Sequence, residues 1–282
     1  MAGRMRFAID VAPLGELAEP SAIVRLAEAA EASGWDGLST WDVLGVSMGT
    51  TAPDPFVVLA AVASRTTRLR LIASVIALSR RRPHLVAQAA STVDRWSGGR
   101  LTLGVGAGAD PAELEAFGEA GDRATRIARF DESVGLVDAF LRGERVEHAG
   151  PGYSVSGVAV CPPPVQRPRP PIWLGGMRPG ALRRAVRWDG WIAIAIAEDG
   201  SGMVLSPEAF GEMAATVHAE RTLAGRAEEP FDIALFGSSE VDESGLVARY
   251  AAAGATWWLE SLSPMRGDLA RLIARIEAGP PR

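Results

Sequence analysis

Apolar strand patterns and amphipathic helix patterns alternate eight times along this chain. The expected strands cover residues 6–12, 36–41, 69–78, 99–108, 170–176, 190–197, 231–237 and 255–261. The expected helices follow them at residues 21–34, 55–66, 83–96, 125–143, 179–188, 207–224, 243–253 and 268–277. Such alternation suits any parallel sheet, including a doubly wound α/β fold. Eight units in 282 residues favour a (β/α)8 TIM barrel, which typically has about 250 residues.

Residues 144–170 interrupt the alternation. Their first part, HAGPGYSVSGVAV, has the pattern of a short hairpin, and the following CPPPVQRPRPP has that of an extended polyproline segment. We therefore expect a single barrel domain over residues 1–282, with an insertion after the fourth helix. The insertion is either a packed surface excursion or a lid over the barrel mouth.

Charge and cysteine content limit the binding partners and the cellular location that we expect for the protein. The net charge is −5, and all 29 cationic residues are arginines without a basic tract, which argues against a nucleic-acid partner. The single cysteine, Cys161, cannot form an internal disulfide, and no N-terminal signal-peptide pattern is present. No apolar run approaches the roughly 20 residues that span a bilayer. We expect a cytoplasmic protein that contacts no membrane and has no metal site.

The run Gly104-Val-Gly-Ala-Gly-Ala109 raises the possibility of a Rossmann phosphate loop. That fingerprint needs a helix immediately after the turn and an acidic residue at the end of the next strand, about 20 positions on. Here Asp110 and Pro111 follow, and no second strand lies at that distance. In a barrel, Gly104, Gly106 and Gly108 would instead let the backbone approach a ligand at the mouth, or simply turn a corner.

Several segments together resemble the bacterial-luciferase-like superfamily of flavin- and deazaflavin-dependent oxidoreductases. They are residues 53–108, from PDPFVV to GVGAG, and then PPIWLGGMRPGALRRA, WDGWI and YAAAGATWWL, in this order. The resemblance implies a (β/α)8 barrel with a long insertion after the fourth helix. It also implies a cofactor at the C-terminal mouth of the barrel, either FMN or the deazaflavin coenzyme F420.

The resemblance assigns a cofactor phosphate to the turn formed by Gly175, Gly176, Met177 and Arg178. Two glycines leading into a helix expose amides at a positive helix end, which suits a phosphate, although a plain strand–helix turn would also explain them. It also implies a non-prolyl cis peptide at Ser74-Val75, behind the cofactor ring. On this basis we expect Gly176→Val to weaken cofactor binding while leaving the thermal midpoint nearly unchanged.

The chain departs from the family pattern at the end of the second strand. Members often carry Asp-His or Glu-His there, whereas Trp41 and Asp42 are followed by Val43. Asp42 is the candidate orienting acceptor, or general base if burial beside Trp41 raises its pKa, but it could also cap the next turn. His84 starts the third helix and could reach the mouth. One arginine of the run Arg80-Arg-Arg82 could face the cofactor phosphate.

These observations predict an oxidoreductase that transfers a hydride between F420 and a small organic substrate. The alternatives are an FMN-dependent monooxygenase and a non-catalytic barrel. The missing histidine, and Ala109 where relatives often place tryptophan, give the last alternative weight. Analogy with the family also predicts a homodimer. The identity of the substrate cannot be read from the sequence.

Overall fold

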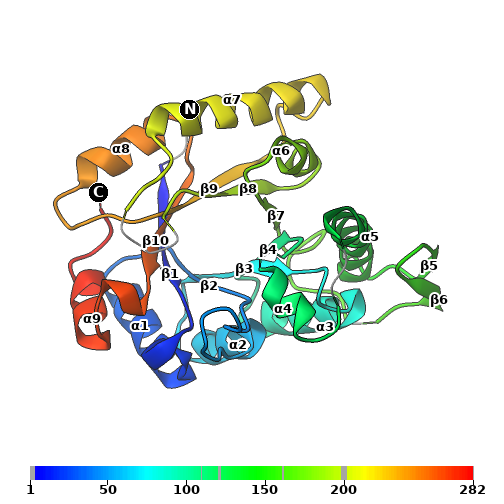
Figure 1. Cartoon of the computed structure of the whole chain (residues 1–282), viewed down its shortest axis with the longest axis horizontal. Coiled ribbons are helices and arrows are strands. Elements are labelled where there is room, and N and C mark those ends of the chain that lie inside the picture. Colours follow the sequence, from blue (N-terminus) through cyan, green and yellow to red (C-terminus); the bar gives the residue numbers. More distant parts are fainter. Residues whose placement is uncertain (1–3, 109, 120–121, 161, 198–201, 282) are drawn as a thin grey trace.

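Eight parallel strands form a closed barrel at the centre of the molecule (Figure 1). The structure, a computed structural model, describes residues 4–108, 110–119, 122–160, 162–197 and 202–281. The barrel strands are β1 (Arg6–Val11), β2 (Gly37–Thr40), β3 (Arg70–Ala77), β4 (Leu101–Gly106), β7 (Ile172–Gly175), β8 (Gly190–Ile194), β9 (Asp232–Gly237) and β10 (Trp257–Leu262). Their order around the barrel is β1-β10-β9-β8-β7-β4-β3-β2. This closed order confirms the predicted (β/α)8 architecture and rules out an open doubly wound sheet.

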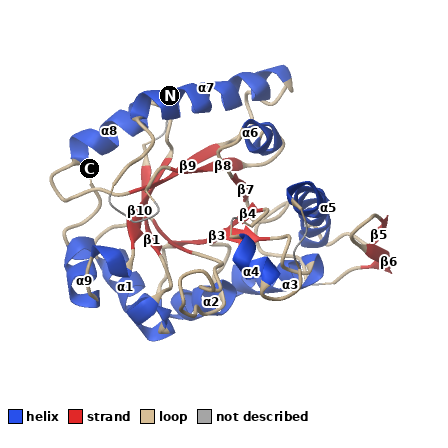
Figure 2. Cartoon of the chain, in the orientation of Figure 1, coloured by secondary structure: helices blue, strands red, loops and turns tan. Residues whose placement is uncertain are grey.

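Helices surround the barrel on its outside (Figure 2). They are α1 (Pro20–Ala32), α2 (Pro55–Arg65), α3 (Pro83–Trp96), α4 (Pro111–Glu115), α5 (Arg123–Leu141), α6 (Pro179–Ala185), α7 (Pro207–Leu223), α8 (Ser244–Ala252) and α9 (Leu269–Glu277), with 3-10 turns at Gly15–Ala18 and Pro264–Arg266. Proline begins α1 to α4, α6 and α7, because its fixed φ suits the first helical position. None of the described helices is both long and apolar enough to cross a membrane.

The short helix α4 is absent from the sequence prediction. It begins at Pro111, and the side chain of Asp110 accepts a hydrogen bond of 2.9 Å from the amide of Ala112. The sequence pattern assigns no helix or strand to residues 109–124. The Asp-Pro pair is in fact an ordinary helix start, with an N-cap followed by proline.

Along six of the eight barrel strands (β1, β3, β7, β8, β9 and β10), side chains contribute to two apolar cores. One core lies between the strands and the helices, and a smaller cluster fills the barrel interior: Ala8, Ile72, Trp173, Ile192, Ala234, Phe236, Trp257 and Leu259. Trp257 belongs to the interior cluster and Trp258 to the outer core. The period of two that the sequence indicates for this strand is therefore observed.

The hairpin expected within residues 144–170 is present. Strands β5 (Val146–Ala149) and β6 (Ser154–Val158) pair antiparallel on the outer side of α5 (Figure 2). The buried carboxylate of Glu132 on α5 accepts hydrogen bonds from His148 Nε2 at 2.7 Å and from the amide of Tyr153 at 3.0 Å. This attachment favours a packed surface excursion over a lid. Cys161, in the proline-rich segment after the hairpin, lies outside the described residues.

Candidate active site

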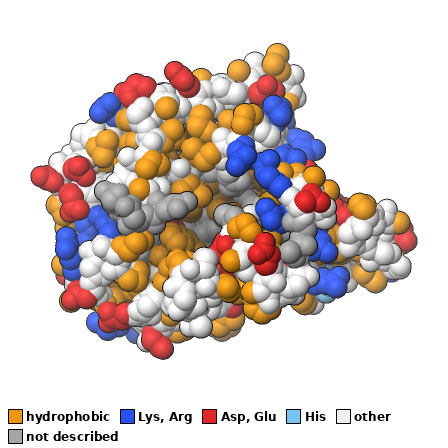
Figure 3. Space-filling view, in the orientation of Figure 1, with side chains coloured by type: hydrophobic (Ala, Val, Ile, Leu, Met, Phe, Trp, Pro, Cys, Tyr) orange, Lys and Arg blue, Asp and Glu red, His pale blue; other side chains and the backbone are white. Residues whose placement is uncertain are grey.

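The C-terminal ends of the barrel strands form one face of the molecule, which Figure 3 presents to the viewer. Active sites of such barrels lie at this end because the loops after the strands converge there. Figure 3 shows a hollow near the centre of this face, with apolar side chains around it and arginines gathered along the rim over α5 and α6. The candidate residues at the ends of β2, β3, β4 and β7 belong to this face.

The Ser74-Val75 peptide bond is cis, as the family resemblance implies. The Ser74 hydroxyl is buried and has no hydrogen-bond partner in the described part of the chain. Three glycines make room for this segment. A Cβ added to Gly104 would lie 3.0 Å from Ser74 Cβ, and one added to Gly106 or Gly175 would lie 2.7 or 3.0 Å from a Val75 methyl group. Close packing around Ser74 and Val75 is thus one reason for these glycines, and their contact with a ligand stays a prediction.

Gly108 serves the turn rather than this packing. Its φ of +78° belongs to the left-handed region that favours glycine. A Cβ there would lie 3.3 Å from Ser79 Oγ, which itself donates a hydrogen bond of 2.7 Å to the carbonyl of Ala107. Gly108 therefore lies in the corner after β4, from which the chain continues toward α4. The glycine run lies in a closed barrel and is not a Rossmann loop.

The turn after β7 leaves two amides without acceptors. The Gly176 amide donates to the Ile192 carbonyl at 3.2 Å, and the Gly176 carbonyl accepts from Trp191 Nε1 at 2.8 Å. The amides of Met177 and Arg178 have no acceptor within the described residues. Of the predicted phosphate ligands, these two amides are available, whereas the amide of Gly176 already belongs to the sheet.

The expectation that Gly176→Val would spare stability is wrong. Gly176 has a φ of +136°, which side-chain-bearing residues rarely adopt, and a Cβ there would lie 2.7 Å from Ala181 Cβ. Valine at this position would strain the backbone and collide with α6. The substitution should therefore lower the thermal midpoint as well as disturb the turn.

Asp42 is saturated by hydrogen bonds. Its side chain is 1% exposed and accepts from Arg80 Nη2 at 2.7 Å, from Arg81 Nε and Nη2 at 2.8 Å each, and from the amide of Ala77 at 3.0 Å. Each oxygen accepts two hydrogen bonds, so the acceptor positions of the carboxylate are filled by groups of the protein. This geometry favours a structural role for Asp42, and its role as a general base stays a prediction.

The same two arginines continue the ion-pair network. Arg80 also pairs with Glu113, and Arg81 pairs with Asp54 at 2.9 Å. The Glu113 carboxylate additionally accepts from the amide of Gly45 at 2.9 Å. These carboxylates already engage both guanidinium groups, and a contact between this basic run and a cofactor phosphate stays a prediction. The two arginines join the loop after β2 to β3 and α4.

His84 lies in the first turn of α3 and is exposed. No hydrogen bond or ion pair joins it to Trp41 or Asp42 within the described chain. The structure therefore does not bring together the three residues that were candidates for acid–base chemistry. Trp41 is half-buried, and it contacts a different acid.

That acid is Asp10, which the sequence reasoning missed. Trp41 Nε1 donates a hydrogen bond of 2.7 Å to Asp10 Oδ2, and the Asp10 side chain is fully buried. Burial raises the pKa of Asp10 from 3.8 to about 7, although interactions with Ser39 and Trp41 partly lower it. The signal was present in the strand RFAIDVA, where the aspartate shares the face of Ala8 between apolar neighbours.

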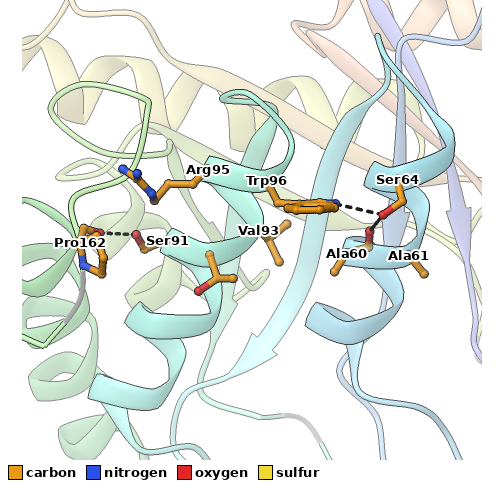
Figure 4. A pocket seen from close by; sticks show the side chains of 9 residues that line it. Ala60, Ala61, Ser64, Ser91, Val93, Arg95, Trp96 and Pro162 are labelled. Carbon is orange, nitrogen blue, oxygen red and sulfur yellow. Dashed lines mark hydrogen bonds between the residues drawn. The ribbon is translucent and has the colours of Figure 1, made fainter.

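A prominent groove lies outside the barrel, between α2 and α3 (Figure 4). Trp96 is 68% exposed in this groove, and its Nε1 donates to Ser64 Oγ at 3.0 Å. Ala60, Ala61, Ser91, Thr92, Val93, Arg95 and Pro162 also line it. None of the candidate site residues contributes to this groove, so it is separate from the candidate active site.

Comparisons with known proteins agree with this architecture. The model of a family described as luciferase-like monooxygenase matches residues 5–278. An uncharacterised protein of Mycobacterium tuberculosis is 32% identical over 228 residues, which cover 74% of each chain. A monooxygenase structure from Streptomyces bottropensis has a TM-score of 0.80 at 21% identity over 97% of both chains. The structure of an F420-dependent secondary alcohol dehydrogenase with an F420–acetone adduct has a TM-score of 0.82 at 15% identity over 99% of both. At these identities the structural likeness shows a shared fold.

Proposed function

The chain belongs to the luciferase-like monooxygenase family, and from this premise we propose that it is an oxidoreductase that transfers a hydride between coenzyme F420 and a small organic substrate. The observation that carries the proposal is the pairing, at the barrel mouth, of the cis Ser74-Val75 segment with the two acceptor-free amides after β7. The single-barrel length and the full-length likeness to an F420-dependent dehydrogenase support F420.

The residues at the mouth fit a cofactor with a planar polar ring and a phosphate. The amides of Met177 and Arg178 would hold the phosphate, since two N–H groups with no acceptor suit an anion. The unpartnered Ser74 hydroxyl would bond the polar edge of the ring. When bound, F420 supplies a site that accepts or donates a hydride. The apolar barrel interior beneath would keep water from the reacting atoms.

An FMN-dependent monooxygenase is the second candidate. The description of the matching family and the likeness to the Streptomyces monooxygenase favour it. A non-catalytic barrel is the third candidate, because Val43 replaces the usual histidine and arginines saturate Asp42. All three share the barrel and differ in what the mouth binds.

Fluorescence titration separates these candidates. We expect the protein to change F420 fluorescence saturably and to leave FMN fluorescence unchanged at the same concentrations. Saturable FMN binding without F420 binding would support the monooxygenase. If neither coenzyme binds, the oxidoreductase proposal is wrong and the non-catalytic barrel is the better account.

A matched pair of variants locates the phosphate. Arg178 has φ −78° and ψ 151°, which proline also adopts, so Arg178→Pro removes one amide N–H and keeps the dihedral angles of residue 178. Losing one hydrogen bond to a charged group should weaken binding by about 10- to 100-fold. Arg178→Ala removes the cationic side chain but keeps the amide. If both variants bind equally well, the backbone of this turn does not hold the phosphate.

We further propose that the protein forms a homodimer through the α2–α3 surface. Val57, Leu85 and Trp96 are 67%, 55% and 68% exposed on these helices, and such an apolar surface typically marks an interface. Light scattering should give twice the chain mass at micromolar concentration. A charge in the groove between these helices, Trp96→Arg, should give the mass of one chain with an unchanged circular dichroism spectrum.

A further inference from the structure

Asp10 is a carboxylic acid inside the barrel near its C-terminal end. Ala8 belongs to the interior cluster, whereas Ile9 and Val11 belong to the outer core, so the alternation of β1 directs Asp10 inward. In the sheet register Asp10 lies opposite Ser39 on β2 and Ser261 on β10. Both serines are buried. Asp10 is thus the acid in a short polar arc above an otherwise apolar barrel interior.

The two oxygens of Asp10 have different environments. Oδ2 accepts the 2.7 Å hydrogen bond from the indole of Trp41, which is half-buried at the end of β2. Oδ1 is buried and makes no well-formed hydrogen bond with the described residues, although the Ser39 hydroxyl lies close enough to lower the pKa of Asp10. Buried polar atoms are normally paired, and exceptions often mark a place that a ligand or a proton completes. Because Oδ2 accepts from Trp41, Oδ1 is the oxygen that would carry the proton of a neutral Asp10.

No charged side chain of the described residues faces Asp10. Charged residues on the neighbouring elements are paired outside the barrel or at its opposite end: Asp42 with Arg80 and Arg81, Glu260 with Arg266 and Arg275, and Arg6 with Asp232. Burial therefore dominates the environment of Asp10, and only Ser39 and Trp41 offset it. An ionised Asp10 would be an uncompensated charge in an apolar surrounding.

We propose that Asp10 is a positioning residue that stores one proton beneath Trp41 and so decides which charge form of a ligand the barrel mouth accepts. The proposal rests on the proposed function, because it concerns a ligand at the same mouth. An anionic ring would be repelled by an ionised Asp10 through a medium of low polarity, whereas a protonated Asp10 would not repel it. Binding of the anion would therefore take up one proton from solvent onto Asp10, with no bond made or broken in the ligand.

The direction of the pH effect follows from the burial of Asp10. Its pKa is raised to about 7, so near neutral pH both protonation states are populated. An anionic ligand nearby would raise this pKa further. Affinity for the anion should then fall as the pH rises above about 7, by at most about tenfold per pH unit, because one proton is involved.

The ligand-free protein provides the first test. In the nitrogen–proton NMR spectrum of the tryptophan indoles, the signal absent in Trp41→Phe should titrate in wild type with a midpoint near 7. It should stop titrating in Asp10→Asn. Ser39→Ala removes an interaction that lowers the pKa of Asp10, so the midpoint of the Trp41 signal should move to higher pH. This variant tests the assignment even if Asp10→Asn fails to fold. Trp35 and Trp191 donate to backbone carbonyls and serve as internal controls. A Trp41 signal that does not titrate between pH 5.5 and 8.5 overturns the proposal.

Ligand binding provides the second test. Reduced F420 and reduced FMN are titrated into wild type and Asp10→Asn at pH 6.0 and pH 8.5. At pH 8.5 the variant should bind the coenzyme more tightly than wild type, by about fivefold or more, and at pH 6.0 the two should agree within about twofold. A merely structural role would weaken binding in the variant at both pH values, and that result contradicts the proposal. Failure of both coenzymes to bind wild type overturns the proposed function and the ligand selection together. Binding with the same pH dependence in both proteins overturns the role of Asp10 alone.

Discussion

Replacing the carboxylate of Asp42 with an amide removes one charge from a buried network. Arg80 and Arg81 both donate to this carboxylate, whose side chain is 1% exposed. Breaking a buried ion pair on one side typically costs about 3 to 5 kcal/mol. Arg80 retains its ion pair with Glu113, and Arg81 retains its ion pair with Asp54. We therefore expect a loss of stability at the lower end of this range, about 3 kcal/mol. With an unfolding entropy of about 2.1 cal/mol/K for each of 282 residues, Asp42→Asn should lower the thermal midpoint by about 5 °C.

Thermal unfolding of matched variants measures this effect. Asp54→Asn makes the same substitution at the 39% exposed end of the network, and asparagine can still cap α2, so its midpoint should fall by less than about 2 °C. Cofactor affinity and turnover should fall less than tenfold in Asp42→Asn measured below its unfolding transition. A midpoint within about 2 °C of wild type together with a turnover loss of about 100-fold would refute this reasoning. It would restore Asp42 as the general base.

Two further predictions follow from the packing and the charge of the barrel interior. Gly106→Ala should destabilise the protein by about 1 to 3 kcal/mol, because its Cβ would lie 2.7 Å from a Val75 methyl group, and denaturant unfolding measures this. Gly135→Ala on the exposed side of α5 should instead stabilise it by about 0.5 to 1 kcal/mol, since nothing lies within 4 Å of the added carbon. Asp10 holds its proton more tightly in the folded than in the unfolded state between pH 4 and 7, because its pKa is raised from 3.8 to about 7. The contribution of Asp10 to the free energy of unfolding should therefore fall as pH rises through this window. Relative to wild type, Asp10→Asn should become more stable between pH 4 and pH 8, by up to about 4 kcal/mol. Equal pH dependence of unfolding in both proteins would contradict the buried titration.

The barrel was predictable because its strands and helices show characteristic patterns of apolar residues along the sequence. Each strand is an apolar run, and most helices begin at a proline or at a capping side chain, so both the eight units and the closed architecture follow from local patterns. Short elements were not predicted, because they show no such pattern. Helix α4 has five residues, too few to show a period of 3.6.

The site was predictable only where a backbone motif marks it. The cis Ser74-Val75 bond and the turn at Met177 and Arg178 coincide with family motifs. The partners of Asp42 could not be read from its neighbours in sequence, because they follow β3, 38 and 39 residues away. Asp10 was missed because its pKa depends on burial in a closed barrel, which a single strand pattern does not show.

A crystal structure of the protein with bound F420 tests the central claim most directly. We predict that the phosphate accepts hydrogen bonds from the amides of Met177 and Arg178, and that the ring lies against Ser74 and Val75 at the barrel mouth. The opposite result is a well-ordered coenzyme bound elsewhere, such as the groove between α2 and α3, with the mouth empty. That outcome would show that this barrel does not use its C-terminal face as a cofactor site.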